Sequence, residues 1–302
     1  MTLLDSLIAQ AGRGIIAPGV YDALTALIAA RQGFDCLYLS GASLAYSRLG
    51  RPDIGLVSVS ELAETVALIC DRVGLPLIVD GDTGFGNALN VQRTVRQLER
   101  AGAAAIQIED QSFPKRCGHL QGKRLVSVTE MTGKIRAATD ARQNAGVKII
   151  ARTDAIAVEG FGNALDRAQA YHEAGADILF IEAPRTRDEL ETIGRRFGHG
   201  TPLVANMVEG GKTPLHAADD LIAMGYRIVI FPGGAARAMA RQAQDYYSSL
   251  SRTGSNAAFH DRMFDLDTLN ATIGLQEMLD LGRDYDLNPD QVAAETRKPP
   301  SA

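Results

Sequence analysis

The chain alternates short apolar runs with longer segments in which apolar residues recur at helical spacing. The runs are apolar at consecutive positions, as in strands buried on both faces of a parallel sheet. Eight runs can be counted: Ile15–Ala17, Cys36–Leu39, Leu77–Val79, Ala105–Ile108, Ile149–Ala151, Ile178–Ile181, Leu203–Ala205 and Ile228–Phe231. Before four of them we expect a glycine to end a helix in the left-handed conformation: Gly33, Gly102, Gly175 and Gly225. Helices that alternate with buried strands predict an α/β fold.

Eight strands are what a closed (β/α)8 barrel of the TIM type requires. The competing architecture is a doubly wound open sheet. A helix is expected to start at a serine cap near residue 58, with Glu61 and Glu64 in its first turns, and the next helix at Asn90. No composition shift or linker divides the chain before about Ser251. We therefore predict a barrel domain over residues 1–255.

The chain is longer than a minimal barrel requires. A long helix is predicted from Ala235 to about Leu250, and two further helical patterns cover Asp261–Asn270 and Thr272–Leu281. We assign residues 256–302 to a C-terminal helical extension. Amphipathic helices outside the barrel predict packing against another subunit, so we expect an oligomer.

Charge and composition narrow the functional classes. The net charge is -5, and acidic and basic residues are interleaved along the chain, which argues against a nucleic acid partner. No stretch approaches the length of a membrane span, and the N-terminus lacks the pattern of a secretory signal, so we expect a cytoplasmic protein without a membrane partner. Cys36 and Cys70 lie in apolar runs, whereas Cys117 lies among cations.

Polar residues follow most of the apolar runs directly. In a barrel of this type the carboxyl ends of the strands carry the chemistry, so these residues are expected to meet at one mouth. They are Tyr38, Ser40 and Gly41 after the second run, Asp80 and Asp82 after the third, Glu109 and Asp110 after the fourth, Arg152 and Asp154 after the fifth, Glu182 after the sixth and Asn206 after the seventh. A single acid in such a place is usually solvated, but a succession of strand ends with polar groups indicates a site.

The acidic residues of this set predict a metal site. Asp80, Asp82 and Glu109 offer carboxylate oxygens without histidine, which favours Mg²⁺, with Mn²⁺ as an alternative. The glycines around Asp82 also allow a loop that binds phosphate, but two acids inside such a loop would repel the anion. A Zn²⁺ site at Cys117 and His119 lacks further soft ligands. No strand end carries a lysine for a Schiff base, and no strand is followed by the glycine spacing of a dinucleotide site.

The loop over residues 111–126 surrounds Cys117 with cations. It is long for a connection between strand and helix, which makes it a candidate active-site lid. Beside Lys115 and Arg116, and near His119, we expect the pKa of the Cys117 thiol to be lowered, so that it exchanges a proton near neutral pH. The alternative is an exposed thiol among solvated cations.

Five motifs in order make the interpretation specific. The segments YLSGAS, VDGDTGFG, KRCGH, ARTDA and NMVEGGKTP resemble the isocitrate lyase and phosphoenolpyruvate mutase superfamily, and in length the chain is most similar to the short 2-methylisocitrate and dimethylmalate lyases. The resemblance implies a (β/α)8 barrel, a homotetramer in which the terminal helix is swapped between subunits, and Mg²⁺ as cofactor.

The resemblance also implies roles for individual residues. It implies that Tyr38 helps to deprotonate the substrate's 2-hydroxyl group. It further implies that Ser40, Gly41 and Ala42 hold the α-carboxylate. Asp82 would bind Mg²⁺ directly, with Asp80, Glu109 and the more distant Asp53 holding its waters. By the same resemblance the catalytic lid comprises Lys115, Cys117, Gly118 and His119, and the residues that contact substrate are Arg152, Glu182 and Asn206.

These roles suit cleavage of the C2–C3 bond of a 2-hydroxy acid. Mg²⁺ and Arg152 would gather negative charge at C2, and Cys117 would protonate the departing enolate. We expect a branched 2-hydroxy di- or tricarboxylate to yield pyruvate and a second carboxylate. We expect the choice of substrate to depend on the lid, on Ala42 and on the segment FPGGAARAM after the eighth run. Gly233 and Gly234 in this segment are smaller than expected for a 2-methylisocitrate lyase, which points to a differently branched acid. The alternatives are oxaloacetate hydrolysis or decarboxylation, phosphonopyruvate mutation or hydrolysis, and a barrel that binds a dicarboxylate without turnover.

Overall fold

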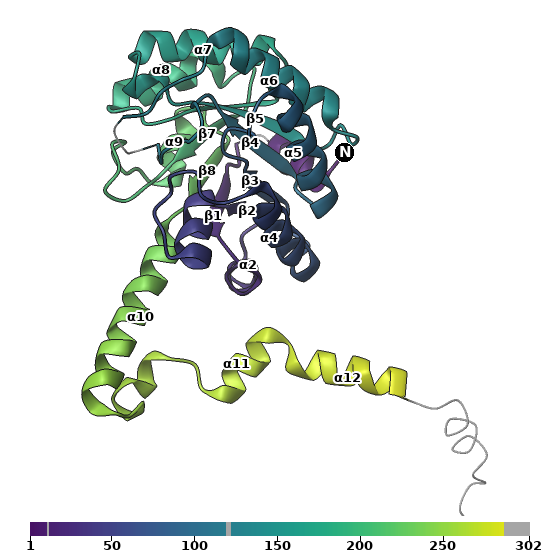
Figure 1. Ribbon diagram of the computed structural model, residues 1–302, viewed down its shortest axis with the longest axis vertical. Helices are drawn as coiled ribbons and strands as arrows, with labels where there is room; N and C mark the ends of the chain where they lie inside the picture. The colour runs from purple at the N-terminus through teal and green to yellow at the C-terminus, as the bar shows by residue number, and fades with distance from the viewer. Residues whose placement is uncertain (11, 119–121, 287–302) are drawn as a thin grey trace, which may run out of the picture. The chain divides into compact units, whose positions relative to one another are not determined.

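Eight parallel strands close into a barrel in the computed structural model, which describes residues 1–10, 12–118 and 122–286 (Figure 1). The strands are β1 (Ile15–Val20), β2 (Leu37–Leu39), β3 (Leu77–Asp80), β4 (Ala105–Glu109), β5 (Lys148–Thr153), β6 (Ile178–Ile181), β7 (Leu203–Asn206) and β8 (Ile228–Phe231). Each pairs with the next, and β8 pairs with β1 through Ile15 and Ile228. The barrel prediction is confirmed, and the doubly wound alternative is wrong because closure leaves no sheet edge.

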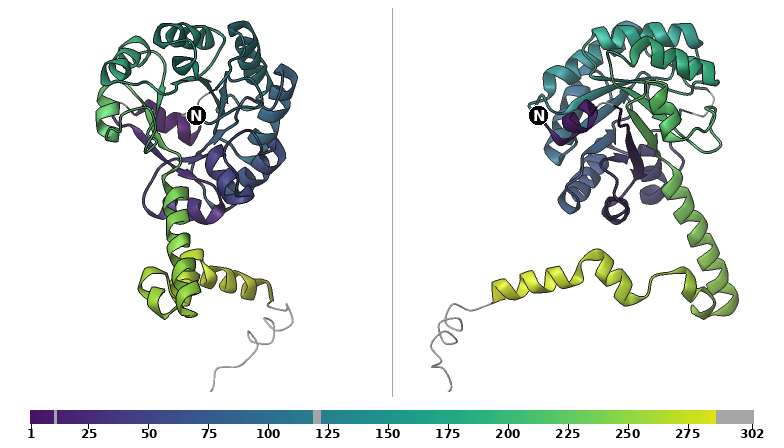
Figure 2. Two further views of the ribbon diagram at one scale, coloured as in Figure 1. Left: turned by 60° about the vertical axis from the view of Figure 1, so that its left-hand side comes forward. Right: turned by 180° about the vertical axis from the view of Figure 1, so that it is seen from behind.

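Helices surround the strands, and the left view of Figure 2 shows them as a ring. The helices of the ring are α2 (Ala23–Arg31), α4 (Val59–Arg72), α5 (Ala88–Ala101), α6 (Val128–Ala141), α7 (Phe161–Glu173), α8 (Arg187–Phe197) and α9 (Ala218–Ala223), and α10 (Gly234–Thr253) follows β8. Short helical turns follow β2, as α3 (Gly41–Leu44) and η1 (Ala45–Leu49), and β5, as η2 (Ala155–Ala157). All four glycines predicted to end helices have positive φ angles.

Side-chain caps set where two of these helices begin. Ser58 accepts a hydrogen bond from the backbone N–H of Glu61, as predicted for α4. The predicted start of the next helix at Asn90 is wrong, because α5 begins one turn earlier. Asn87 caps it by accepting from the N–H of Asn90, whose own side chain accepts from the N–H of Asn87. The residue three positions into a capping box resembles a cap in sequence but lies inside the helix.

The core has two layers, one inside the barrel and one between the strands and the helices. Inward-facing residues such as Ile78, Ile150 and Phe180 fill the barrel, and a larger cluster packs between the strands and the ring of helices. The first helix, α1 (Leu3–Ala9), adds Leu4 and Leu7 to the inner cluster and lies inside the ring in the left view of Figure 2. A filled barrel leaves the loops after the strands as the place for a site.

The contacts divide the chain into two compact units, Met1–Ala240 and a second from Arg241 onward. The predicted domain boundary at residue 255 stays a prediction. Within the second unit the helical pattern at Asp261–Asn270 is shifted: residues Ala257–Arg262 form a 3₁₀ turn, and α11 (Leu266–Ile273) begins where Asp265 accepts from the N–H of Thr268. Gly274 then separates α11 from α12 (Leu275–Asp286). No described helix is long and apolar enough to span a bilayer.

Candidate active site

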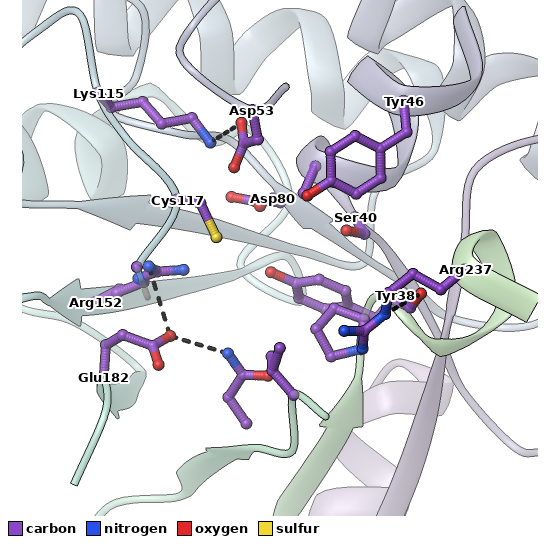
Figure 3. Close-up of a pocket in the computed structure, with 16 residues that line it drawn as sticks. Tyr38, Ser40, Tyr46, Asp53, Asp80, Lys115, Cys117, Arg152, Glu182 and Arg237 are labelled. Carbon is purple, nitrogen blue, oxygen red and sulfur yellow. Dashed lines mark hydrogen bonds and ion pairs between the residues drawn. The ribbon is translucent and has the colours of Figure 1, made fainter. Parts of the chain in front are cut away.

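A pocket lies at the carboxyl ends of the strands, where the sequence predicted it (Figure 3). Its predicted lining residues are Tyr38, Ser40, Ala42, Asp53, Asp80, Lys115, Cys117, Gly118, Arg152, Glu182 and Asn206. Gly41, Asp82 and Glu109 do not line it but lie in contact with lining residues: Gly41 N–H donates to Asp80, Asp82 pairs with Lys115, and Glu109 with Arg152. His119 lies outside the described residues. The fold therefore gathers almost the whole predicted set around one cavity.

Two acids and one lysine, Asp53, Asp80 and Lys115, form one wall of the pocket, and Asp82 contacts this wall through Lys115. The Nζ of Lys115 lies 2.5 Å from Oδ1 of Asp53 and 2.7 Å from Oδ1 of Asp82. Although burial favours the neutral amine, the surrounding carboxylates raise the pKa of Lys115 well above its ordinary value, so it stays protonated. Burial, together with repulsion from Asp80 and Asp53, raises the pKa of Asp82 to about 7 against the pull of Lys115. The wall holds more negative charge than its lysine neutralises.

Asp80 is positioned by three donors. Its Oδ1 accepts from Nε2 of Gln107 at 3.0 Å and from the N–H of Asp82 at 3.3 Å, and its Oδ2 accepts from the N–H of Gly41 at 3.4 Å. The same Gln107 accepts through Oε1 from the phenol of Tyr38 at 2.9 Å. Burial, and after it the charge of Asp80, raises the pKa of Tyr38 well above its ordinary value. The phenol is therefore a hydrogen-bond donor at neutral pH.

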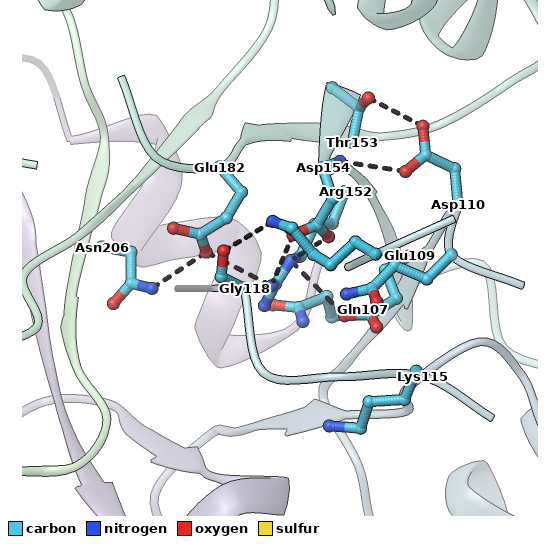
Figure 4. Close-up of polar contacts among 12 residues, drawn as sticks. Gln107, Glu109, Asp110, Lys115, Gly118, Arg152, Thr153, Asp154, Glu182 and Asn206 are labelled. Carbon is cyan, nitrogen blue, oxygen red and sulfur yellow. Dashed lines mark hydrogen bonds and ion pairs between the residues drawn. The ribbon is translucent and has the colours of Figure 1, made fainter. Parts of the chain in front are cut away.

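Arg152 forms the opposite wall and is held from several sides (Figure 4). Its Nε lies 3.0 Å from Oδ2 of Asp154 and 3.4 Å from Oε2 of Glu109, and its Nη2 lies 3.2 Å from Oδ1 of Asp154 and 3.5 Å from Oε2 of Glu182. Glu182 in turn accepts from Nδ2 of Asn206 at 3.0 Å. This buried guanidinium is a fixed positive charge that faces the cavity, suited to a carboxylate.

Cys117 enters the pocket between these two walls, and Figure 3 shows its sulfur directed into the cavity. Its backbone N–H donates to the carbonyl of Asp53 at 3.2 Å. The base of its loop is held by the side chain of Gln111, which donates to the carbonyl of Arg116 at 2.7 Å and accepts from the N–H of the same residue at 3.0 Å. The lowered pKa expected for Cys117 stays a prediction.

The acidic wall fits a divalent cation. Oε1 of Glu109 is buried and has no hydrogen-bond partner among the described residues, and Oδ1 of Asp82 is paired with Lys115 at 2.7 Å. In the described part of the chain no three His, Cys, Asp or Glu side chains converge into a ready-made cage. Mg²⁺ is commonly held by one or two carboxylates and several waters, so the residues present suit it better than a metal that needs a full protein cage.

Two lining residues were missed by the sequence reasoning, Tyr46 and Val208, whereas Pro232 and Arg237 lie in the segment FPGGAARAM where the choice of substrate was expected. Tyr46 lies on η1 after β2, Val208 and Pro232 follow the ends of β7 and β8, and Arg237 is in the first turn of α10. Their position just after strands was the available signal. Arg237 lines the cavity from the side of β8; its Nη1 donates to the carbonyl of Glu209 at 2.7 Å, and its guanidinium is also paired with the carboxylate of Glu209.

Comparisons with known proteins agree with this geometry. The family model for phosphoenolpyruvate phosphomutase matches residues 4–251. The chain is 43% identical over 271 residues to 2,3-dimethylmalate lyase of Eubacterium barkeri, covering 90% of this chain and 93% of that one. It is 49% identical over 263 residues to 2-methylisocitrate lyase of Aeropyrum pernix, covering 87% and 84%.

Solved structures show the same likeness. A structure of 2,3-dimethylmalate lyase has a TM-score of 0.89 at 36% identity and covers 94% of this chain and 96% of that one. A structure of oxaloacetate acetylhydrolase with the inhibitor 3,3-difluorooxalacetate has a TM-score of 0.89 at 33% identity and covers 95% and 97%.

Proposed function

Because the chain belongs to the phosphoenolpyruvate phosphomutase family, we infer that this carbon–carbon lyase cleaves a branched 2-hydroxy di- or tricarboxylate, of the 2,3-dimethylmalate or 2-methylisocitrate type, to pyruvate and a second carboxylate. The observation that carries the proposal is the position of the Cys117 thiol. It enters one cavity between the cation of Arg152 and the acidic wall of Asp53 and Asp80. A thiol in that place can donate a proton to the substrate.

The reaction breaks one carbon–carbon bond and moves two protons. The 2-hydroxyl gives its proton to a carboxylate of the acidic wall, C2 becomes a carbonyl, and the electron pair of the C2–C3 bond passes to C3, which becomes the enolate of a carboxylic acid. The thiol of Cys117 then donates its proton to C3. Arg152 binds the carboxylate next to C2, and its fixed charge offsets the charge that develops there. Tyr38 donates its own proton to Gln107, so its phenol oxygen in the cavity can accept a hydrogen bond from the 2-hydroxyl and help to deprotonate it.

We propose Mg²⁺, or Mn²⁺ in its place, as the cofactor. Asp82, Asp80 and Glu109 would hold it, with Asp53 further out. When bound, the cation supplies positive charge to the C2 oxygen and carboxylate of the substrate as negative charge develops. The unpartnered oxygen of Glu109 and the excess of acids over Lys115 support this assignment.

We propose that the residues after β8 that line the cavity determine substrate specificity. Gly233 lines the cavity beside Arg237, and a β-carbon there would meet that guanidinium at 3.5 Å, which is ordinary contact. The wall therefore has room for a branch on C3, and Arg237 supplies a cation for the second carboxylate.

The first experiment measures pyruvate release, coupled to a dehydrogenase, from 2,3-dimethylmalate and 2-methylisocitrate with Mg²⁺ or with EDTA. Metal-dependent cleavage of either acid supports the proposal. Cys117→Ser should lose turnover and keep Mg²⁺-dependent binding of substrate. A wild type that releases pyruvate or glyoxylate from no branched 2-hydroxy acid would refute it, and substrate binding without turnover would indicate a dicarboxylate-binding barrel.

Oxaloacetate hydrolysis is the second candidate, favoured by the likeness to the acetylhydrolase structure. Incubation with oxaloacetate in parallel separates the two. Oxalate and acetate as products would mark a hydrolase, and pyruvate a decarboxylase.

We also propose a cytoplasmic homotetramer in which the C-terminal helices are swapped between subunits. Apolar side chains exposed on α11 and α12, among them Leu266, Ile273 and Met278, support a subunit contact. Sedimentation of the full chain should give the mass of four subunits. A monomer at micromolar concentration would contradict this assembly.

A further inference from the structure

A buried lysine beside the active site has no role in the reaction described above. The side chain of Lys123 is 2% exposed. Its Nζ donates to Oδ1 of Asp154 at 2.7 Å and to the backbone carbonyl of Gly118 at 2.5 Å. Burying an ammonium costs free energy unless it is paired, so a lysine at this position indicates a structural or functional role.

The carboxylate that receives Lys123 also receives Arg152. Oδ1 of Asp154 accepts from both Nζ of Lys123 and Nη2 of Arg152, and Oδ2 accepts from Nε of Arg152. Against the effect of burial, these two cations hold the pKa of Asp154 well below its ordinary value. One fully buried carboxylate thus joins the substrate-facing arginine to the lysine of the cysteine loop.

Asp154 is itself fixed to the barrel. Its N–H donates to Oδ1 of Asp110 at 2.9 Å, and the other oxygen of Asp110 accepts from Thr153 Oγ1 at 2.7 Å (Figure 4). The same oxygen of Asp110 also accepts from the phenol of Tyr171 at 2.8 Å. Asp110 therefore holds Asp154 at the end of β5, and Tyr171 of α7 helps to hold Asp110. A loop that contacts the carboxylate of Asp154 is thereby fixed relative to the barrel.

Lys123 also contacts Gly118, the residue after Cys117. Gly118 lines the cavity, and a β-carbon at this position would lie 2.3 Å from Nη2 of Arg152 and 2.9 Å from Cγ of Glu182. The backbone there is in direct contact with the guanidinium. Its carbonyl has the ammonium of Lys123 as its side-chain donor.

We propose that Lys123 is a positioning residue that ties the Gly118 carbonyl to Asp154, so that the thiol of Cys117 and the guanidinium of Arg152 are held in one geometry. The proposal rests on the function proposed above and deepens it. Proton donation to C3 requires the thiol at a defined place relative to the carboxylate bound by Arg152, and a displacement of about 1 Å in an active site commonly costs about 10²-fold in rate. Lys123 touches neither substrate nor cation in this scheme.

The test compares Lys123→Met with Arg124→Met, which removes an exposed cation from the next position of the same loop. The first readout is kcat and KM for the cleaved acid. In Lys123→Met we expect kcat to fall by about 10²-fold and KM to change by less than about fivefold, because Asp154 still holds Arg152 by two hydrogen bonds. In Arg124→Met both constants should match the wild type.

The second readout needs no turnover. Iodoacetamide labelling of Cys117, followed by peptide mass spectrometry, should be several times faster in Lys123→Met than in the wild type, and unchanged in Arg124→Met. A functional effect without a labelling effect, or the reverse, would overturn the proposal, and so would equal effects in both variants. If Lys123→Met does not fold, Lys123→Gln takes its place; because the amide keeps a donor but removes the charge, kcat and the labelling rate should change in the same directions by smaller factors, and unchanged values would overturn the proposal.

Failure of the proposed function is recognised separately. A wild type without activity on any branched acid or oxaloacetate refutes that function, and the labelling rates then decide the role of Lys123 alone. A fully active wild type with an equally active, equally labelled Lys123→Met refutes the positioning role and leaves the function standing.

Discussion

Gly118→Ala is the substitution whose effect the structure defines most sharply. The added β-carbon would lie 2.3 Å from Nη2 of Arg152, whereas favourable contact between such atoms begins at about 3.5 Å, so the guanidinium must move by about 1 Å. The backbone at Gly118 does not have a positive φ, so alanine itself introduces no backbone strain. The effect is therefore one of contact alone.

The magnitude follows from which atom is displaced. Nη2 is the nitrogen that contacts both Asp154 Oδ1 at 3.2 Å and Glu182 Oε2 at 3.5 Å, so both contacts weaken together. We expect kcat/KM to fall by about 10²-fold, equivalent to about 2.7 kcal/mol of transition-state stabilisation. Overpacking should also lower the free energy of unfolding by about 1–3 kcal/mol.

The assay is coupled pyruvate release together with thermal unfolding of the same preparations. Gly133→Ala, inside α6, is the matched control because nothing lies within 4 Å of its added carbon. It should keep wild-type kinetics and gain about 0.5–1 kcal/mol of stability from helix propensity. A Gly118→Ala enzyme whose kcat/KM stays within about threefold of the wild type would refute the reasoning that the position of Arg152 limits the rate.

Three further outcomes are expected. Saturating Mg²⁺ should raise the unfolding temperature of the wild type by about 5 °C or more, and Asp82→Asn should lose most of that shift; equal shifts in both would remove Asp82 from the metal site. Cys36 is buried with its pKa raised to about 12, so at pH 8 only about 10⁻⁴ of it is thiolate and a thiol reagent should modify Cys117 first; mass spectrometry that finds Cys36 labelled at the same rate would contradict this. Asp110→Ala should lower the free energy of unfolding by about 3 kcal/mol, because Arg167 and other buried donors lose their acceptor; denaturant titration checks the value, and a loss below about 1 kcal/mol would argue against a structural role for this network.

Much of the architecture was predictable because it is encoded locally. Each strand is a run of apolar residues, and each glycine predicted to end a helix has the left-handed conformation that glycine adopts without strain. Membership of the family was predicted from the motifs and is confirmed by the family match. The error at Asn90 was also local: two asparagines three positions apart both fit a cap, and only the backbone shows that Asn87 takes it.

The composition of the site was predictable for a different reason. Parallel strands of a barrel end at the same mouth, so residues that follow strands converge whatever their separation in the chain. Cys117, Arg152 and Asp80 therefore meet although they come from different connections. Tyr46 was missed because it lies on a helical turn after a strand, where sequence does not show which face of the helix turns toward the cavity.

By itself the sequence determined the order and type of the elements, the barrel and the set of side chains at its mouth, because periodicity and strand-end position are properties of neighbouring residues. Only the tertiary structure decided how charges are shared among them. That Lys115 sits between Asp53 and Asp82, and that Lys123 and Arg152 share Asp154, depends on distances between distant segments and on exclusion of water. Burial strengthens each of these interactions, and burial exists only once the barrel has closed.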